Sequence, residues 1–220
     1  MVAGIQMNYN KKQAIANLLD DLQSNNKLKY TFVFVPEGYE VDYSEVDAYD
    51  IKQDDIHIID EYADMFRERK YSYHKYISGI EDAPNILNSF ASGDIQVLLS
   101  MKCLDEGVDI PRAEYAIFCS STGNPRQFVQ RRGRVLRKSK EKEKATIWDL
   151  IVMPPMNYTN DEVLSVDRNL FMSEVKRIVN FAVLADNETE IIYTDLKRIC
   201  DHLHIPLYEL IDEEYKQYNI

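Results

Sequence analysis

Glycine is scarce in this chain of 220 residues, and the few glycines are widely spread. The closest pair is ten residues apart, with the seven glycines at positions 4, 38, 79, 93, 107, 123 and 133. A phosphate-binding P-loop follows the pattern G-x-x-x-x-G-K-[ST], and a dinucleotide fingerprint follows G-x-G-x-x-G. Neither motif exists in this sequence, so the chain has no phosphate loop of its own.

Long apolar runs and cysteines are also few. No uninterrupted apolar run exceeds five residues, whereas a membrane-spanning helix needs roughly 20. The first residues lack the apolar core of a signal peptide. Three cysteines, an odd number and far apart, do not form a disulfide framework. We therefore expect a cytoplasmic protein that has no membrane partner.

Acidic residues outnumber basic ones, and both kinds are unevenly distributed. The chain carries 26 basic and 37 acidic residues, a net charge of −11, which argues against a general polyanion-binding surface. Residues 131–144 hold eight basic and two acidic residues, whereas residues 37–55 hold eight acidic residues and one lysine. A concentrated basic segment on an acidic protein favours one specific anion site. A charge run alone, however, is more often a solvated helix end.

The hydrophobic pattern predicts strands that alternate with helices. Continuous apolar runs, typical of strands covered on both faces, occupy residues 30–35, 95–100, 115–119 and 144–152. Apolar residues at helical spacing occupy residues 11–22, 56–66 and 86–90. We also predict a strand at 73–77, an exposed aperiodic loop at 38–55 and a helix C-cap at Gly93. This alternation favours a parallel α/β sheet.

The pattern changes after Pro154 and Pro155. Residues 161–186 have apolar side chains at helical spacing, and two shorter helical stretches follow. We therefore predict two units, an α/β domain at residues 1–155 and a helical extension at residues 156–220.

One segment combines basic residues with helical spacing. Asn124 and Pro125 are typical of a helix start, and Gln130, Arg134 and Arg137 follow with spacings of four and three residues. On a helix these three side chains fall within about 60° of one another. Two guanidiniums that converge in this way match the oxygens of a phosphate. A surface arginine face that pairs with carboxylates would show the same spacing, so the spacing alone leaves both interpretations open.

Four stretches of the chain resemble a known family. QRRGRVLR at residues 130–137 resembles motif VI of superfamily 2 helicases, and LDEGVDIP at residues 104–111 resembles their motif V. YTFVFVP resembles motif IV, and GDIQVLLS resembles the strand that leads into motif V. The resemblance covers residues 30–152. It implies the second RecA-like lobe of such an enzyme, a parallel-sheet α/β domain of the P-loop NTPase type that lacks its own P-loop.

The resemblance also implies a shared ATP site. In this family ATP and Mg²⁺ lie between two lobes, and the first lobe brings the P-loop and the Mg²⁺ ligands. The second lobe brings arginine fingers, which correspond here to Arg134 and Arg137 as catalytic residues. Gln130, Gly107 and Asp109 correspond to residues that contact the nucleotide. No metal ligand is expected in the present chain.

Nucleic acid is the second partner that the resemblance implies, with DNA favoured over RNA. Motif V commonly has a threonine that touches a backbone phosphate, and that position is Met101 here, with Ser100 just before it. We expect contacts to nucleic acid at Ser100, Met101 and Gly79. The other expected partner is the N-terminal RecA-like lobe of the same protein.

Two further patterns resemble functional sites. IIDEYAD at residues 58–64 resembles a DExx box, but no P-loop precedes it and it follows motif IV. We therefore predict that Asp60 and Glu61 lie on the solvated face of a helix, near its N-terminus. Cys200, His202 and His204 form one short cluster without a second ligand pair. We expect a buried cysteine and surface histidines there.

The sequence thus predicts the C-terminal lobe of an ATP-dependent helicase, whose N-terminal lobe completes the ATP site. We expect that the 220-residue chain alone does not hydrolyse ATP. One alternative is a double-stranded DNA translocase subunit of a restriction or repair system. Another is a non-enzymatic adaptor lobe that binds nucleic acid, although an adaptor would not need Gln130, Arg134 and Arg137.

Overall fold

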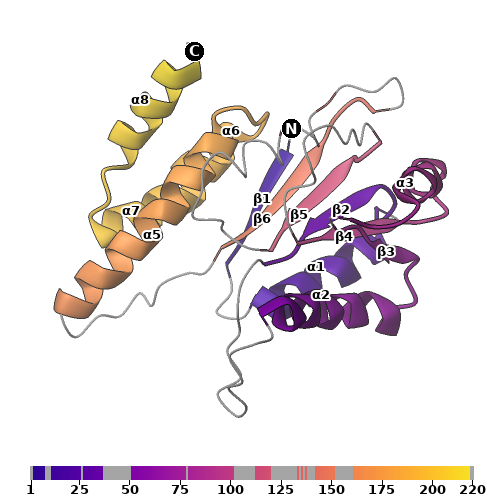
Figure 1. Cartoon of the computed structure of the whole chain (residues 1–220). Coiled ribbons are helices and arrows are strands. Elements are labelled where there is room, and N and C mark those ends of the chain that lie inside the picture. Colours follow the sequence, from indigo (N-terminus) through magenta and orange to yellow (C-terminus); the bar gives the residue numbers. More distant parts are fainter. Residues whose placement is uncertain are drawn as a thin grey trace.

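The computed structural model describes most of the chain. The described parts are residues 2–7, 11–25, 27–36, 51–77, 79–101, 112–119, 133, 135, 137, 142–151 and 161–218. Within them the chain forms a six-stranded sheet with helices on both faces, and a group of helices beside one edge (Figure 1).

Every pair of neighbouring strands in this sheet is parallel, in the order β1-β6-β5-β2-β4-β3. The strands are β1 (Val2–Met7), β2 (Thr31–Phe34), β3 (Tyr73–Lys75), β4 (Val97–Ser100), β5 (Tyr115–Phe118) and β6 (Thr146–Ile151). This arrangement confirms the predicted parallel α/β fold. The edge strand β1 was not predicted from the sequence.

Apart from the helical residues Gly133 and Val135, the described ranges contain three helices in the α/β part and four in the extension. The first group is α1 (Lys11–Ser24), α2 (Ile51–Glu68) and α3 (Ala83–Ser92). The extension contains α5 (Asp161–Ala182), α6 (Glu188–Glu190), α7 (Lys197–Leu203) and α8 (Leu207–Tyr218), with a π-helical segment η1 (Ile191–Leu196) between α6 and α7. The predicted helical extension is therefore confirmed.

Alternate residues of the central strands pack into two separate cores, one on each face of the sheet. On one face, Val33, Leu99 and Ile117 pack with α1 and α2. On the other face, Phe32, Leu98 and other strand residues pack with α3 and with Phe181 of α5. Central strands buried on both faces need apolar residues throughout, which is why their sequences read as continuous apolar runs.

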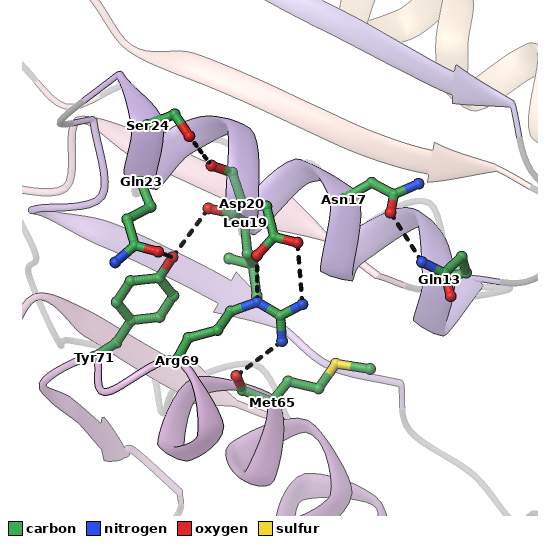
Figure 2. A network of polar contacts seen from close by, with 9 residues as sticks. All are labelled: Gln13, Asn17, Leu19, Asp20, Gln23, Ser24, Met65, Arg69 and Tyr71. Atoms are coloured by element: carbon green, nitrogen blue, oxygen red, sulfur yellow. Dashed lines mark hydrogen bonds and ion pairs between the residues drawn. The ribbon is translucent and has the colours of Figure 1, made fainter.

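Polar contacts hold α1 and α2 side by side (Figure 2). Arg69, just after α2, donates from Nε to Asp20 Oδ1 at 2.6 Å and from Nη1 to the Met65 carbonyl at 3.2 Å. The hydroxyl of Tyr71 donates to the Leu19 carbonyl at 3.1 Å. The hydrogen bond from Arg69 lowers the pKa of the Asp20 carboxyl. These contacts fix the helix pair that covers one face of the sheet.

Helix boundaries show one correct and one wrong prediction. Gly93 follows α3 with a φ of 85°, and its N–H donates to the Phe90 carbonyl, so the predicted C-cap is confirmed. The predicted loop at 38–55 is wrong in its last part, because α2 begins at Ile51. The rest of that acidic segment, residues 38–50, lies outside the described residues. Charged residues at 52, 54 and 55 concealed the first turn of this helix.

The extension packs directly on the α/β sheet. Ile151, the last residue of β6, belongs to the same apolar core as α5, α7 and α8. From the same helix α5, the ring centroid of Phe181 lies 5.4 Å from that of Phe118 in β5. Figure 1 shows the extension beside β1 and β6. Within the described ranges, no helix is long and apolar enough to cross a membrane.

Candidate functional site

The carboxyl edge of the sheet gathers the residues predicted to contact nucleic acid. Ser100 ends β4, and Gly79 follows the neighbouring strand β3, in which Lys75 pairs with Leu99 of β4. Since the two strands are parallel, both residues lie toward the same edge. Gly79 is exposed and has a φ of 77°, a conformation that glycine adopts without strain.

Of the three residues predicted to contact nucleic acid, two are buried and one is exposed. Ser100 is 0% exposed and Met101 is 6% exposed, and the Met101 side chain packs in the core beneath α1 and α2. The Ser100 carbonyl accepts a hydrogen bond of 2.9 Å from the N–H of Val35. This burial argues against contacts through the side chains of Ser100 and Met101 and leaves Gly79 as the accessible member of the predicted set.

The arginine segment is described at three positions. Gly133 and Val135 have helical backbone, and Arg137 lies beyond the last described helical residue. Val135 is 2% exposed and packs in the same core as Phe118 and Phe181, whereas Arg137 is exposed. The buried side chain of Val135 thus packs this segment against the core of the α/β domain. Because Arg137 is not itself helical, helical periodicity alone does not fix the direction of its side chain.

The remaining predicted nucleotide contacts lie outside the described residues. They are Gln130, Arg134, Gly107 and Asp109. At Gly133, which is described, no atom of the described residues lies within 4 Å of the place where a Cβ would stand. Packing among the described residues therefore does not explain a glycine in this helix, where glycine costs roughly 0.5–1 kcal/mol relative to alanine.

The arginine segment ends at the amino edge of the sheet. Lys142 donates from Nζ to the carbonyl of Val135 at 2.6 Å and to the carbonyl of Ala113, just before β5, at 3.0 Å. Ser100 stands at the opposite, carboxyl edge of the same parallel sheet. The structure thus places the end of the arginine helix and the predicted nucleic-acid contacts at different edges.

Asp60 and Glu61, the acids of the DExx-like stretch, have structural partners. Both lie in the middle of α2, so the prediction that they sit near the N-terminus of their helix is wrong. Asp60 forms an ion pair with Lys75 of β3, and Glu61 accepts a hydrogen bond of 2.6 Å from Lys12 of α1. These pairs tie α2 to its neighbours, which agrees with the structural interpretation.

The Cys200 cluster is divided between the core and the surface. Cys200 is 0% exposed, and burial raises the pKa of its thiol to about 12. His202 and His204 are exposed, as predicted, and His204 ends α7 with a φ of 53°. In the part of the chain that the structure describes, no three residues among His, Cys, Asp and Glu are grouped to hold a metal ion.

One residue of interest escaped the sequence reasoning. Lys142 belongs to a lysine-rich stretch that alternates with glutamate and is typical of a solvated surface. The structure instead shows its ammonium half-buried against two backbone carbonyls. Lys144, two residues further, keeps the expected exposed position and forms an ion pair of 2.9 Å with Asp186. The alternating sequence gives no signal that distinguishes these two lysines.

Comparison with known proteins places this fold in a family. The family model described as helicase conserved C-terminal domain matches residues 10–139, which is more than half of the chain. The chain therefore belongs to this family. It is a second RecA-like lobe of the superfamily 2 helicase and translocase class.

Curated relatives match over part of this lobe. The chain is 43% identical over 68 residues to the DNA 3'-5' translocase XPB2 of Sulfurisphaera tokodaii, a match that covers 31% of the chain and 15% of the relative. It is 32% identical over 72 residues to putative helicase 22 of a Sulfolobus islandicus filamentous virus, which covers 33% of the chain and 13% of the relative. The matched segments thus span less than a sixth of either relative.

Solved structures of helicase-type proteins share the fold. The C-terminal part of the Fun30 ATPase domain aligns with a TM-score of 0.51 at 14% identity, over 71% of the chain and 44% of that structure. The crystal structure of the E. coli DEAD-box protein SrmB bound to RraA aligns with a TM-score of 0.51 at 13% identity, over 77% and 86%. At these identities the likeness concerns the fold alone.

Proposed function

We propose that this lobe works in an ATP-dependent helicase or translocase that acts on nucleic acid, with DNA favoured over RNA. The observation that carries the proposal is the helicase-family match, which includes the arginine segment at residues 130–137. At the described end of that segment, Val135 is anchored in the core while Arg137 is exposed. An exposed arginine that follows an anchored residue suits a group that must reach a partner outside its own domain.

The proposed reaction is hydrolysis of ATP between this lobe and an N-terminal lobe. That lobe would hold the substrate ATP on its P-loop and would supply the Mg²⁺ ligands. Arg134 and Arg137 would bind the γ-phosphate and stabilise the charge that develops in the transition state. Gln130, Gly107 and Asp109 would contact the nucleotide. An arginine finger contributes roughly 10³ to 10⁵ in rate, or about 4 to 7 kcal/mol.

The absence of described atoms beside Gly133 supports close approach of a second body. Glycine weakens a helix, and no described atom would meet a Cβ at this position. Packing among the described residues therefore gives no reason for the glycine. In the proposal, the nucleotide or the N-terminal lobe would approach the helix at this glycine. The exposed Gly79 would contact the nucleic-acid backbone at the carboxyl edge of the sheet, together with the main chain near Ser100 and Met101.

Mutation of Arg137 tests the proposed role in the protein that contains both lobes. We expect Arg137→Ala to abolish nucleic-acid-stimulated ATP hydrolysis and to leave DNA binding largely unchanged. Arg198→Ala, which removes an exposed arginine on α7, is the matched control and should retain activity. Wild-type turnover in the Arg137 variant would overturn the finger assignment. We expect the 220-residue chain alone to hydrolyse no ATP.

Translocation on duplex DNA without strand separation is a second candidate function. The printed name of the Sulfurisphaera tokodaii relative, a DNA 3'-5' translocase, favours it. A strand-displacement assay beside a triplex-displacement assay separates the two candidates, because a translocase that does not unwind displaces only the third strand. DNA binding without any ATP hydrolysis by the two-lobed protein would instead support the adaptor alternative.

A further inference from the structure

Lys142 forms a bridge between two segments that are far apart in the sequence. Its Nζ lies 2.6 Å from the Val135 carbonyl oxygen and 3.0 Å from the Ala113 carbonyl oxygen. The side chain is half-buried, and an ammonium carries three donors, so both carbonyls accept from the same group. The bridge links the start of β5 to the end of the arginine helix.

The Val135 carbonyl is a fitting acceptor for a cation. Val135 is helical and Arg137 is not, so this carbonyl belongs to the last turn, where carbonyls lack intrahelical donors. The C-terminal end of a helix also carries partial negative charge, which favours an ammonium there. Lys142 thus supplies both a donor and the complementary charge to this carbonyl.

Val135 is consequently held in two ways. Its side chain is 2% exposed in the core that contains Phe118 and Phe181, and its carbonyl is held by Lys142. Arg134 precedes Val135 directly, and Arg137 follows it by two residues. Any rotation or fraying of the helix at Val135 would therefore displace both arginines.

We propose that Lys142 is a positioning residue that fixes the end of the arginine helix and thereby the direction of Arg134 and Arg137. The inference rests on the proposed function for the role of the arginines as fingers. The clamp itself, a lysine that bridges Val135 and Ala113, stands on the geometry alone. The two parts are therefore tested by separate measurements.

Lys144 provides a matched control within the same segment. It is also a lysine before β6, but it is 66% exposed and pairs with Asp186 at the surface. Lys142→Met removes the ammonium and keeps most of the apolar stem, and Lys144→Met makes the same chemical change outside the clamp. Lys142→Gln keeps an N–H donor without the charge.

The first measurement is amide hydrogen exchange of the 220-residue chain. Since a hydrogen bond to a charged group shifts a local opening equilibrium by about tenfold or more, we expect about tenfold faster exchange at residues 133–137 in Lys142→Met. Lys144→Met should exchange there like the wild type, and Lys142→Gln should be intermediate. The emission of Trp148, the single tryptophan, reports whether the sheet is intact. If Lys142→Met does not fold, the exchange rates of Lys142→Gln and the wild type at residues 133–137 are compared instead to test the clamp.

The second measurement is ATP hydrolysis by the two-lobed protein. Misplacement of catalytic groups by about 1 Å costs up to 10²-fold in rate, so we expect kcat to fall between about tenfold and 10²-fold in Lys142→Met. KM for ATP should stay within about twofold, because the P-loop of the N-terminal lobe would still hold the substrate. Lys142→Arg, which keeps the charge and the donors, should recover part of kcat.

Each outcome has a distinct meaning. Unchanged exchange at residues 133–137, or faster exchange spread over the whole sheet, would overturn the clamp. Faster local exchange in a two-lobed protein that hydrolyses no ATP would leave the clamp intact and overturn the proposed function. Unaltered kcat in Lys142→Met, in an otherwise active protein, would overturn the positioning role and leave the proposed function standing.

Discussion

Arg177 of α5 donates from Nε to Asp149 Oδ2 of β6 at 2.8 Å, and the two side chains are only 4% and 8% exposed. The Nη2 group of the same guanidinium lies 2.7 Å from Glu174, one turn earlier on α5. Burial alone would lower the pKa of Arg177, but the two carboxylates outweigh it and raise the pKa. A charged, buried contact thus joins the sheet to the helical extension.

Loss of this arginine should destabilise the fold strongly. Removing one partner of a buried ion pair costs about 3–5 kcal/mol, because the other charge is left buried without compensation. We expect Arg177→Met to lower the free energy of unfolding by that amount, measured by urea denaturation with the emission of Trp148. Lys197→Met breaks the exposed pair with Asp201 on α7 and should cost less than about 1 kcal/mol. Equal effects of the two variants would contradict the structural role of Arg177.

The extension should be required for a folded α/β domain. Ile151 of β6 lies in the core formed by the extension, and Phe118 of β5 packs against Phe181. A chain that ends at Pro155 would expose both, and it would leave Asp149 without Arg177. We expect that shortened chain to bind the dye ANS and to aggregate in size-exclusion chromatography. A monomeric residue 1–155 fragment with cooperative unfolding would instead show that the α/β domain is independent of the extension.

The sequence predicts the central strands and the edge strand β3 but not the other edge strand, β1. Residues 115–119 form a continuous apolar run because β5 is buried between helices on both faces, so burial is visible locally. Residues 2–7, VAGIQM, contain no comparable run, and their strand is defined by pairing with β6, from Val2 opposite Thr146 to Met7 opposite Ile151. That partner is remote in the sequence, and local patterns do not encode such pairing.

The candidate site shows the same division between local and remote information. Motif spacing identifies Arg137 as a functional candidate, and the structure leaves this residue exposed. The roles of Lys142 and Lys144 differ because only Lys142 meets the carbonyls of Val135 and Ala113, which the surrounding lysines and glutamates do not indicate. Motif resemblance likewise suggested contacts to nucleic acid at Ser100, which the structure shows to be buried.

Two glycines in the left-handed region should differ in their response to alanine. Gly93 has a φ of 85°, and a Cβ there would lie 3.1 Å from the hydroxyl of Tyr30. Gly79 has a φ of 77°, and no atom of the described residues lies within 4 Å of its Cβ position. Left-handed backbone costs a residue with a side chain about 1–2 kcal/mol. We expect Gly79→Ala to show that cost alone and Gly93→Ala to exceed it in urea denaturation. The reverse order would contradict the close packing of Tyr30 at the end of α3.

Cys200 should make stability fall at alkaline pH. Its pKa is raised to about 12 by burial in the extension, with a smaller contribution from Asp201, whereas the thiol of an unfolded chain ionises near pH ~8.5. The folded state keeps its proton in the window between these values and the unfolded state loses it. The free energy of unfolding therefore falls as pH rises, by up to about 1.4 kcal/mol per pH unit for this one group.

Comparison with Cys200→Ala isolates that contribution from other groups that titrate in the same range. The variant leaves a small cavity whose cost does not depend on pH, so the wild type should be the more stable protein at about pH 7. Its advantage should shrink at about pH 10.5, because only the wild type has a thiol to ionise on unfolding. Urea denaturation at the two pH values, followed by circular dichroism, measures the difference. An advantage of equal size at both pH values would mean that the thiol ionises alike in the folded and unfolded states, which would contradict its burial in the core of the extension.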